Sequence, residues 1–124
     1  MEGHPQTLVA SSHVESRLVL LRILEDLGVN TFASATLAEA EEVLSRQPIA
    51  LVFCDDRLMD GSSRDLLQRL RTSKQSPHTV VTTRTGECKE YLEALGLGAF
   101  DMIQRPYRST DVELNVLRAM RGGY

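Results

Sequence analysis

Two neighbouring aspartates are the most promising chemical groups in this sequence. Asp55 and Asp56 directly follow residues 49–54, an apolar run without a charge. Such a run is typical of a strand that is buried on both faces of a parallel sheet. Asp55 would then lie at the edge where open α/β sheets bind their ligands. The plainer alternative is that Asp55 only caps the strand or the helix that follows it.

Five strand-like runs alternate with five helix-like segments along the chain. The strands are expected near residues 7–10, 29–35, 49–54, 79–83 and 99–104, and the helices near residues 12–27, 36–46, 62–70, 87–95 and 110–120. All the connections are short, and there are no internal repeats. This order predicts a parallel sheet with right-handed crossovers and helices on both faces.

Local signals mark where several of these helices begin and end. Three capping boxes have a hydroxyl residue followed three positions later by glutamate: Ser12 with Glu15, Thr36 with Glu39, and Thr110 with Glu113. Side chains in such a box satisfy the free amides of the first helical turn. Gly28 is in the position that commonly ends a helix, and Ser62 or Ser63 is expected to start the third one. A box at Ser12 would commit that hydroxyl to helix amides.

The composition is that of a soluble globular protein with one domain. The chain has 124 residues, and 14 basic against 17 acidic residues give a net charge of −3. There is no basic excess for nucleic-acid binding, no apolar run of membrane-spanning length and no signal peptide. Two cysteines without a disulfide or zinc pattern are expected to be reduced thiols. We therefore expect a cytoplasmic protein that binds neither nucleic acid nor membranes through this domain.

Three motifs in their order resemble the receiver domain of two-component response regulators. They are Asp-Asp-Arg-Leu-Met-Asp-Gly-Ser-Ser at 55–63, Val-Val-Thr-Thr at 80–83, and Gly-Ala-Phe-Asp-Met-Ile-Gln-Arg-Pro-Tyr at 98–107. The resemblance runs from Thr7 to about Met120. It implies an α/β, flavodoxin-like, doubly wound sheet of five parallel strands in the order 2-1-3-4-5, with five helices. Residues 1–124 would form a single receiver domain, either alone or as the N-terminal part of a longer response regulator.

The resemblance also implies roles for individual residues. Asp55 would be the phosphoacceptor, Thr83 the switch hydroxyl, and Arg105 would stand in place of the family's lysine, with the three converging at one sheet edge. The bond between Arg105 and Pro106 would be cis. Asp56 could be the acceptor only if the strand slipped by one residue. Because such a slip would move every apolar side chain to the opposite face, we assign the role to Asp55.

This sequence departs from the family pattern most seriously at the metal site. Ser11 and Ser12 replace the acidic pair that normally holds magnesium, which leaves Asp55 as the single acidic ligand. Because Mg²⁺ prefers charged oxygen ligands, we expect weak binding at most. We expect an arginine to neutralise Asp55 instead, with Arg105 as the first candidate and Arg84 as the second. Further replacements stand at the loop proline (Met59), the helix-start glycine (Ser63), the small residue after the switch hydroxyl (Arg84) and the aromatic switch (Met102).

The predicted function is that of a receiver domain in phosphorelay signal transduction, and not of an enzyme. It either accepts a phosphoryl group on Asp55 or acts as an atypical, metal-independent receiver through protein contacts, and the missing acidic pair favours the second. Expected partners are a sensor histidine kinase or phosphotransfer protein, and an output domain or effector protein. A homodimer could form through the fourth helix, fifth strand and fifth helix, with Leu97 and Tyr107 as anchors.

Two enzyme-like or carrier-like alternatives fit the sequence poorly. A flavodoxin-type carrier needs a glycine-containing phosphate loop after the first strand, but residues 11–16 contain no glycine, and the chain has no tryptophan to pack on a flavin. A hydrolase triad of Ser12, His13 and Asp55 would need a nucleophile elbow, and the sequence has none.

Overall fold

A central parallel sheet organises the residues that the computed structural model describes, which are 6–84 and 88–121. Its strands are β1 (Thr7–Ala10), β2 (Thr31–Ser34), β3 (Leu51–Asp55), β6 (His78–Thr83) and β7 (Asp101–Gln104), in the order β2-β1-β3-β6-β7. The predicted order 2-1-3-4-5 is thereby confirmed. A short antiparallel pair after β3, formed by β4 (Arg57–Leu58) and β5 (Gly61–Ser62), was not predicted.

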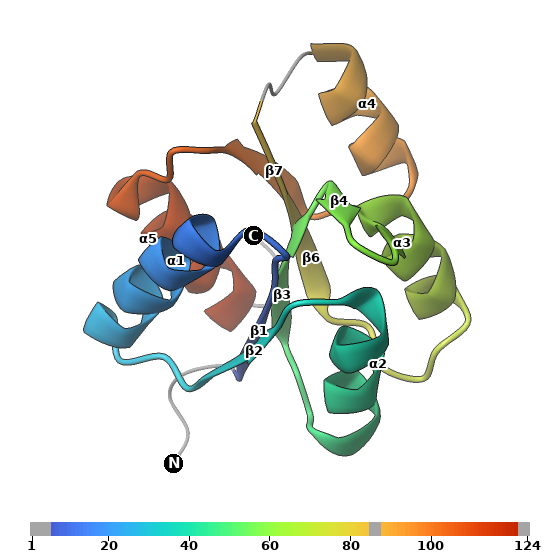
Figure 1. Ribbon diagram of the computed structural model, residues 1–124, viewed down its shortest axis with the longest axis horizontal. Helices are drawn as coiled ribbons and strands as arrows, with labels where there is room; N and C mark the ends of the chain where they lie inside the picture. Colours follow the sequence, from blue (N-terminus) through green and yellow to red (C-terminus); the bar gives the residue numbers. More distant parts are fainter. Residues whose placement is uncertain (1–5, 85–87, 122–124) are drawn as a thin grey trace.

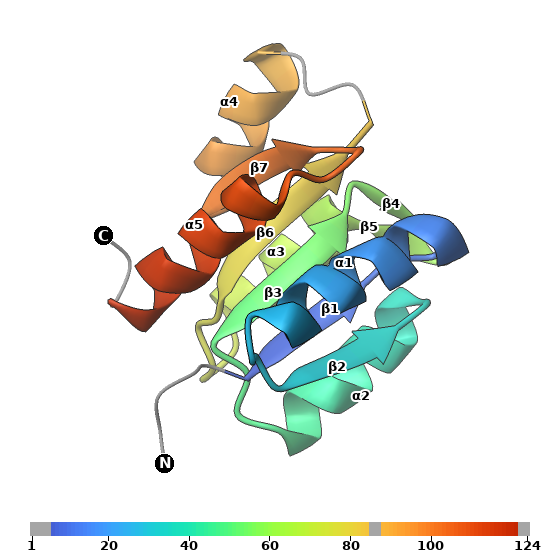
Figure 2. The same cartoon turned by 90° about the vertical axis from the view of Figure 1, so that its left-hand side faces the viewer.

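Helices cover both faces of the sheet, as the alternating pattern predicts (Figure 1). On one face lie α1 (Val14–Asp26) and α5 (Ser109–Met120), and on the other lie α2 (Leu37–Arg46), α3 (Ser63–Arg71) and α4 (Cys88–Gly96). Figure 2 shows α1 and α5 side by side in front of the sheet. The predicted start of the fourth helix at Glu87 lies outside the described residues. Within the described part of the chain, no helix has the length and apolar content needed to cross a bilayer.

The two faces of the sheet are built from alternate residues of the same strands. Phe53 and Val80 pack with the helices α1 and α5, whereas Val52 and Cys54 pack with α2 and α3. This arrangement follows from the two-residue period of a strand, which points successive side chains to opposite faces. All four of these residues are essentially inaccessible to solvent, so each side of the sheet contributes its own hydrophobic cluster.

The local helix signals were right at some helix ends and wrong at others. Thr36 accepts the amide hydrogen of Glu39 at 3.1 Å and caps α2 as predicted. Gly28 has a φ of 76° and ends α1 in the left-handed conformation that glycine tolerates. The prediction that Thr110 caps the last helix is wrong, because the N-cap of α5 is Arg108, two residues earlier, and it makes no side-chain cap bond.

A tight approach between the β3–α3 loop and α2 depends on a glycine. A β-carbon on Gly61 would lie 2.7 Å from Leu37 Cδ2 and 3.0 Å from Asp65 Oδ2. Leu37 is a buried residue of the core, and Asp65 forms a capping box with Ser62 at the start of α3. A larger residue would therefore disturb the core and a helix cap together.

We predict that Gly61→Ala lowers the free energy of unfolding by about 1–3 kcal/mol, the usual cost of overpacking a filled site. The measurement is urea unfolding of the variant and the parent protein. Gly96→Ala is the matched control, because a β-carbon there meets nothing within 4 Å. Equal losses of stability in the two variants would contradict this account of Gly61.

Candidate functional site

Four polar side chains meet at the carboxyl edge of the sheet, on the side that α1 and α5 cover. Each stands two residues beyond a buried core residue of its own strand: Ser11 after Val9, Asp55 after Phe53, Thr82 after Val80, and Arg105 after Ile103. Because strand side chains repeat every two residues, the core face continues directly into these polar groups. The polar site therefore lies on the same face of the sheet as one hydrophobic cluster, directly beyond it at the carboxyl edge.

Asp55 is buried, and its carboxylate is compensated by protein groups. Its side chain is 4% exposed. Oδ2 accepts a 2.7 Å hydrogen bond from Ser11 Oγ, and Oδ1 accepts a 2.6 Å hydrogen bond from Thr82 Oγ1. Nη1 of Arg105 lies 3.1 Å from Oδ1 and supplies the opposite charge. The predicted contact between Asp55 and Arg105 is thus confirmed, as is the cis peptide between Arg105 and Pro106.

The structure places Thr82, and not Thr83, against Asp55. Thr83 lies on the other side of the strand, where its hydroxyl is 3.4 Å from Asp56 Oδ2. The prediction that the Thr83 hydroxyl faces Asp55 is therefore wrong by one position. Asp55 and Thr82 are paired in the register of β3 and β6. One signal could have identified Thr82: it lies two residues after the core residue Val80 and therefore faces the same side of the sheet. Because Thr82 and Thr83 are adjacent threonines, the sequence motif alone did not distinguish them.

Ser12 joins three loops and does not cap a helix. Its hydroxyl donates to the carbonyl of Ala35 at 2.5 Å and accepts the amide hydrogen of Met59 at 3.0 Å. The N-cap of α1 is His13, whose Nδ1 accepts from the Ser16 amide at 3.3 Å. The predicted capping box at Ser12 is therefore wrong. Contacts that are distant in sequence, and invisible to a local pattern, engage this hydroxyl instead.

These residues do not fit a magnesium site. The Ser11 and Ser12 hydroxyls, which replace the acidic pair, are both engaged in hydrogen bonds within the protein. No cluster of three or more His, Cys, Asp or Glu side chains that could hold a metal occurs within residues 6–84 and 88–121. Since Mg²⁺ requires hard and mostly charged oxygen ligands, the neutral hydroxyls would hold it poorly.

Burial keeps two titratable neighbours of Asp55 neutral. The pKa of the Cys54 thiol is raised by burial first and by the charge of Asp55 second. The pKa of the Tyr107 phenol is also raised, chiefly by burial, and its hydroxyl lies near Thr82 and Arg105. Neither group adds a negative charge near Asp55, so Asp56 is its closest acidic neighbour.

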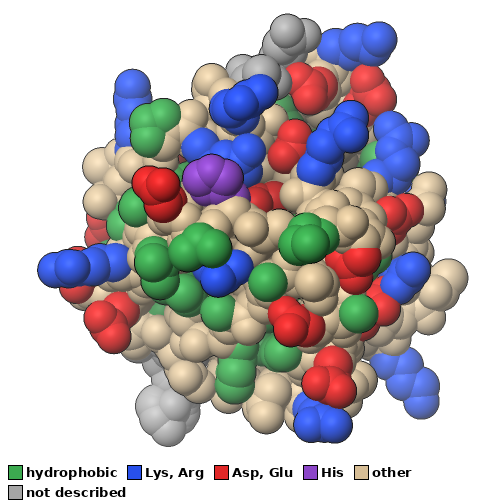
Figure 3. All heavy atoms as spheres, viewed as in Figure 1, with side chains coloured by type: hydrophobic (Ala, Val, Ile, Leu, Met, Phe, Trp, Pro, Cys, Tyr) green, Lys and Arg blue, Asp and Glu red, His purple; other side chains and the backbone are tan. Residues whose placement is uncertain are grey.

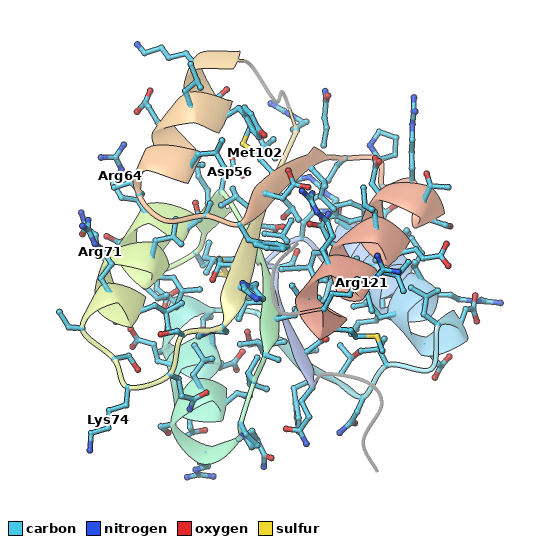
Figure 4. All side chains as sticks on the ribbon, turned by 180° about the vertical axis from the view of Figure 1, so that it is seen from behind. Asp56, Arg64, Arg71, Lys74, Met102 and Arg121 are labelled. Carbon is cyan, nitrogen blue, oxygen red and sulfur yellow. The ribbon has the colours of Figure 1, made fainter. Side chains whose placement is uncertain are left out.

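Asp56 is the more accessible of the two aspartates. Its side chain is 35% exposed, and Arg105 Nη2 lies 4.0 Å from its Oδ1. In Figure 4, Asp56 lies close to Met102, which stands at the predicted aromatic-switch position. Met102 is half-buried against a cluster that includes Val81 and Ala94, so it fills core space. Arg84, the second candidate counterion for Asp55, is exposed, and its carbonyl accepts a hydrogen bond from Gln104.

Asp60 fixes the loop that follows Asp55 to the start of α2. Its two carboxylate oxygens accept the amide hydrogens of Leu37 at 2.6 Å and Ala38 at 3.0 Å. These backbone donors lower the pKa of Asp60 below its ordinary value of 3.8. A carboxylate at a helix N-terminus is also favoured by the helix dipole.

We predict that Asp60→Asn is less stable than the parent protein at neutral pH and equally stable in acid. A carboxyl group with a lowered pKa stabilises the fold above its unfolded pKa, and this contribution is lost as the pH falls through the folded pKa. The difference in unfolding midpoint should therefore begin to shrink near pH 3.8, the ordinary pKa, and should vanish only below the lower pKa of the folded state. A difference that stays constant as the pH is lowered well past 3.8, for as long as both proteins remain folded, would show that charge is not the cause.

Comparison with known proteins identifies one family. The family model described as the response regulator receiver domain matches residues 7–116. Response regulator protein PilR of Pseudomonas aeruginosa is 30% identical over 115 residues, which cover 93% of this chain and 25% of PilR. Photosynthetic apparatus regulatory protein RegA of Rhodovulum sulfidophilum is 30% identical over 98 residues, which cover 79% of this chain and 54% of RegA. The chain thus spans about a quarter to a half of the length of these relatives.

Solved structures agree with this fold. The signal receiver domain of a LuxO repressor protein from Vibrio parahaemolyticus superposes with a TM-score of 0.89 at 17% identity, covering 98% of this chain and 93% of the other. The beryllofluoride-activated NtrC4 receiver domain dimer superposes with a TM-score of 0.87 at 20% identity, covering 96% and 98%. Identities this low bear on the fold alone.

Proposed function

Since this chain belongs to the response regulator receiver domain family of two-component signalling, we propose that it signals as an atypical receiver whose site is held without a divalent cation. The observation that carries this proposal is the environment of the Asp55 carboxylate. An arginine and two hydroxyls compensate the charge that a metal would otherwise balance. In this proposal the domain presents one stable conformation to its partners and acts through protein contacts and not as an enzyme.

Within this proposal, Asp55 retains the place of the phosphoacceptor. Thr82 takes the hydroxyl role that the sequence suggested for Thr83, and Arg105 takes the role of the family's lysine. A phosphoryl donor would have to displace at least one of the groups that bind the 4% exposed carboxylate. Because these contacts favour the unmodified carboxylate, we infer that the unphosphorylated form is the signalling state.

The proposed partners are a histidine kinase or phosphotransfer protein on one side and an output domain or effector on the other. A homodimer through α4, β7 and α5 is the proposed self-association. The anchors predicted for it need correction, because both are partly buried in the core. Leu97 packs against the cluster around Val81, and Tyr107 packs against the cluster that the sheet shares with α1 and α5. Exposed apolar side chains are instead found on α4 (Tyr91 and Leu92) and on α5 (Leu114, Leu117 and Met120).

The proposal is tested directly by incubating the protein with a small phosphodonor and Mg²⁺ and measuring its intact mass. We expect no phosphorylated fraction at Asp55. Asp55→Asn is the control for modification elsewhere. A phosphorylated species in the parent protein that the Asn variant lacks would overturn the metal-independent function.

We predict that Arg105→Ala lowers the free energy of unfolding by about 1–3 kcal/mol, less than the cost for a fully buried pair because Arg105 is 18% exposed. The cost arises because the substitution leaves the Asp55 charge buried and without a counterion. The double variant Asp55→Asn/Arg105→Ala should therefore be less destabilised than the sum of the two single variants. The measurement is urea unfolding with EDTA and with Mg²⁺. A loss for Arg105→Ala that appears only with Mg²⁺ would disprove this role.

We predict that the double variant Ser11→Asp/Ser12→Asp gains a dependence on Mg²⁺ that the parent protein lacks. Without metal, the new carboxylates repel Asp55 and lower the thermal midpoint. With Mg²⁺ at a hundred times the Kd, binding should restore about 2.7 kcal/mol. Thermal unfolding with Mg²⁺ and with EDTA measures both effects. A clear Mg²⁺-dependent rise in the parent protein, abolished by Asp55→Asn, would show that the serines already support a metal site.

A further inference from the structure

A cleft between α3 and α4 lies on the face of the sheet opposite the Asp55 site. Its volume is about 450 Å³, and α3, α4 and the short β4–β5 pair contribute to its walls. Figure 4 shows Asp56 and Met102 close to one another beside α4, with Arg64 on the neighbouring α3. We call this space the α3–α4 cleft. Small-molecule sites commonly have volumes of roughly 300–1,000 Å³, so the α3–α4 cleft is large enough for a small ligand.

One wall of the α3–α4 cleft is apolar and adaptable. Leu67 of α3, Val81 of β6 and Ala94 of α4 are buried members of one hydrophobic cluster, and Met102 packs against them. All four residues line the cleft. Because methionine is unbranched and has three rotatable bonds, Met102 can adjust to an apolar group that enters. This wall therefore favours a ligand with an alkyl or aromatic body.

Asp56 supplies a carboxylate at the end of the α3–α4 cleft that is nearest the sheet. Among the residues that the structure describes, its one ion-pair contact is with Arg105, whose Nη2 is 4.0 Å from Asp56 Oδ1. Arg105 lies closer to Asp55, at 3.1 Å. Oδ2 of Asp56 accepts a long hydrogen bond of 3.4 Å from the Thr83 hydroxyl. Since charge attraction falls with distance, these contacts leave much of the Asp56 charge available to a cation in the cleft.

The rim of the α3–α4 cleft carries charges of both signs with an acidic excess. Nη2 of Arg64 and Oε2 of Glu93 are 3.3 Å apart, and this half-exposed ion pair joins α3 to α4. Figure 3 shows acidic and basic side chains beside one another over α4 and the adjoining part of α3. The lining contains three acidic side chains, Asp56, Glu90 and Glu93, and two basic ones, Arg57 and Arg64. Three negative against two positive charges favour a cation over an anion.

We propose that the α3–α4 cleft binds a small primary amine with an apolar body, with the ammonium group on Asp56 and the body against Leu67 and Met102. A cleft of ligand size with an apolar wall and one well-placed charged group is typical of small-molecule sites. This inference goes beyond the proposed function, because it requires no reaction at Asp55 and no metal. The ligand would contact α3 and α4 together, so its binding would stabilise one relative position of the two helices.

The test is a titration of the protein in EDTA, at neutral pH and constant ionic strength, followed by NMR amide shifts. Three probes share a phenyl ring and differ in the head group: 2-phenylethylamine, 2-phenylethanol and 3-phenylpropionate. We expect saturable shifts near residues 56, 67, 94 and 102 with the amine, and binding of the alcohol that is about tenfold weaker because it lacks the charge. We expect no saturation by the acid. An amine that does not saturate, or an alcohol or acid that binds as tightly as the amine, overturns the proposal.

Asp56→Asn should weaken binding of the amine about tenfold and leave binding of the alcohol unchanged, because it removes the charge and keeps the shape. Asp26→Asn is the matched control, since it removes the same charge from an exposed position of α1, on the other face of the sheet. Equal weakening in the two variants would indicate a general charge effect and would overturn the site.

Ala94→Leu tests the apolar wall separately. It keeps a strong helix former in α4 and fills part of the α3–α4 cleft, so it should weaken binding of the amine and the alcohol alike. Unchanged affinity in the folded variant would overturn the location of the site. Failure of the proposed function, by contrast, would appear as phosphorylation of Asp55 with Mg²⁺.

Discussion

The structure of the sheet edge depends on the burial of a carboxylate. An ionised carboxyl group in a protein interior is expensive unless it is paired and hydrogen-bonded. Asp55 meets this requirement with Ser11 from the end of β1, Thr82 from β6 and Arg105 from the end of β7. One buried charge thus ties the ends of three other strands to the end of β3. Removal of any one of these three groups would leave part of that charge uncompensated.

Protein groups here take over two tasks that a bound divalent cation could perform, namely balancing negative charge and joining separate segments. Arg105 balances the charge of Asp55. Ser12 and Asp60 join the segments, because they hydrogen-bond the loop after β3 to the chain around the start of α2. Such contacts form with the fold itself and need no ion from solution. In the proposed function, these contacts are the physical basis for a site that keeps one state without a metal.

The two neighbouring aspartates differ in burial and in charge compensation. Asp55 lies on the α1–α5 side, buried and compensated, whereas Asp56 lies on the other side and is 35% exposed. The exposed side chains of Arg57 and Arg84 line an open cleft together with both aspartates. The negative charge of the buried Asp55 is therefore neutralised inside the protein, and the additional positive charge of the exposed arginines lies in contact with solvent.

The sequence by itself determined the architecture of this protein and the identity of its central residue. The alternation of apolar runs predicted a parallel sheet with helices on both faces, and the apolar run before Asp55 located the buried carboxylate. The strand order was implied by the resemblance of three motifs to the receiver family. Arg105 was predicted as the counterion of Asp55 because it stands at the place of the family's lysine, before Pro106. These features are set by local patterns and by the geometry common to parallel α/β sheets.

Only the tertiary structure decided which hydroxyls serve the site. Ser11 and Asp55 are 44 positions apart, and Ser12 and Met59 are 47 positions apart, so no local pattern could report these contacts. The choice between Thr82 and Thr83 required the register of β3 with β6, because adjacent residues of a strand face opposite sides. The partners of Ser12 depended on how three loops pack together, and packing drew its hydroxyl away from the helix cap that the sequence favoured.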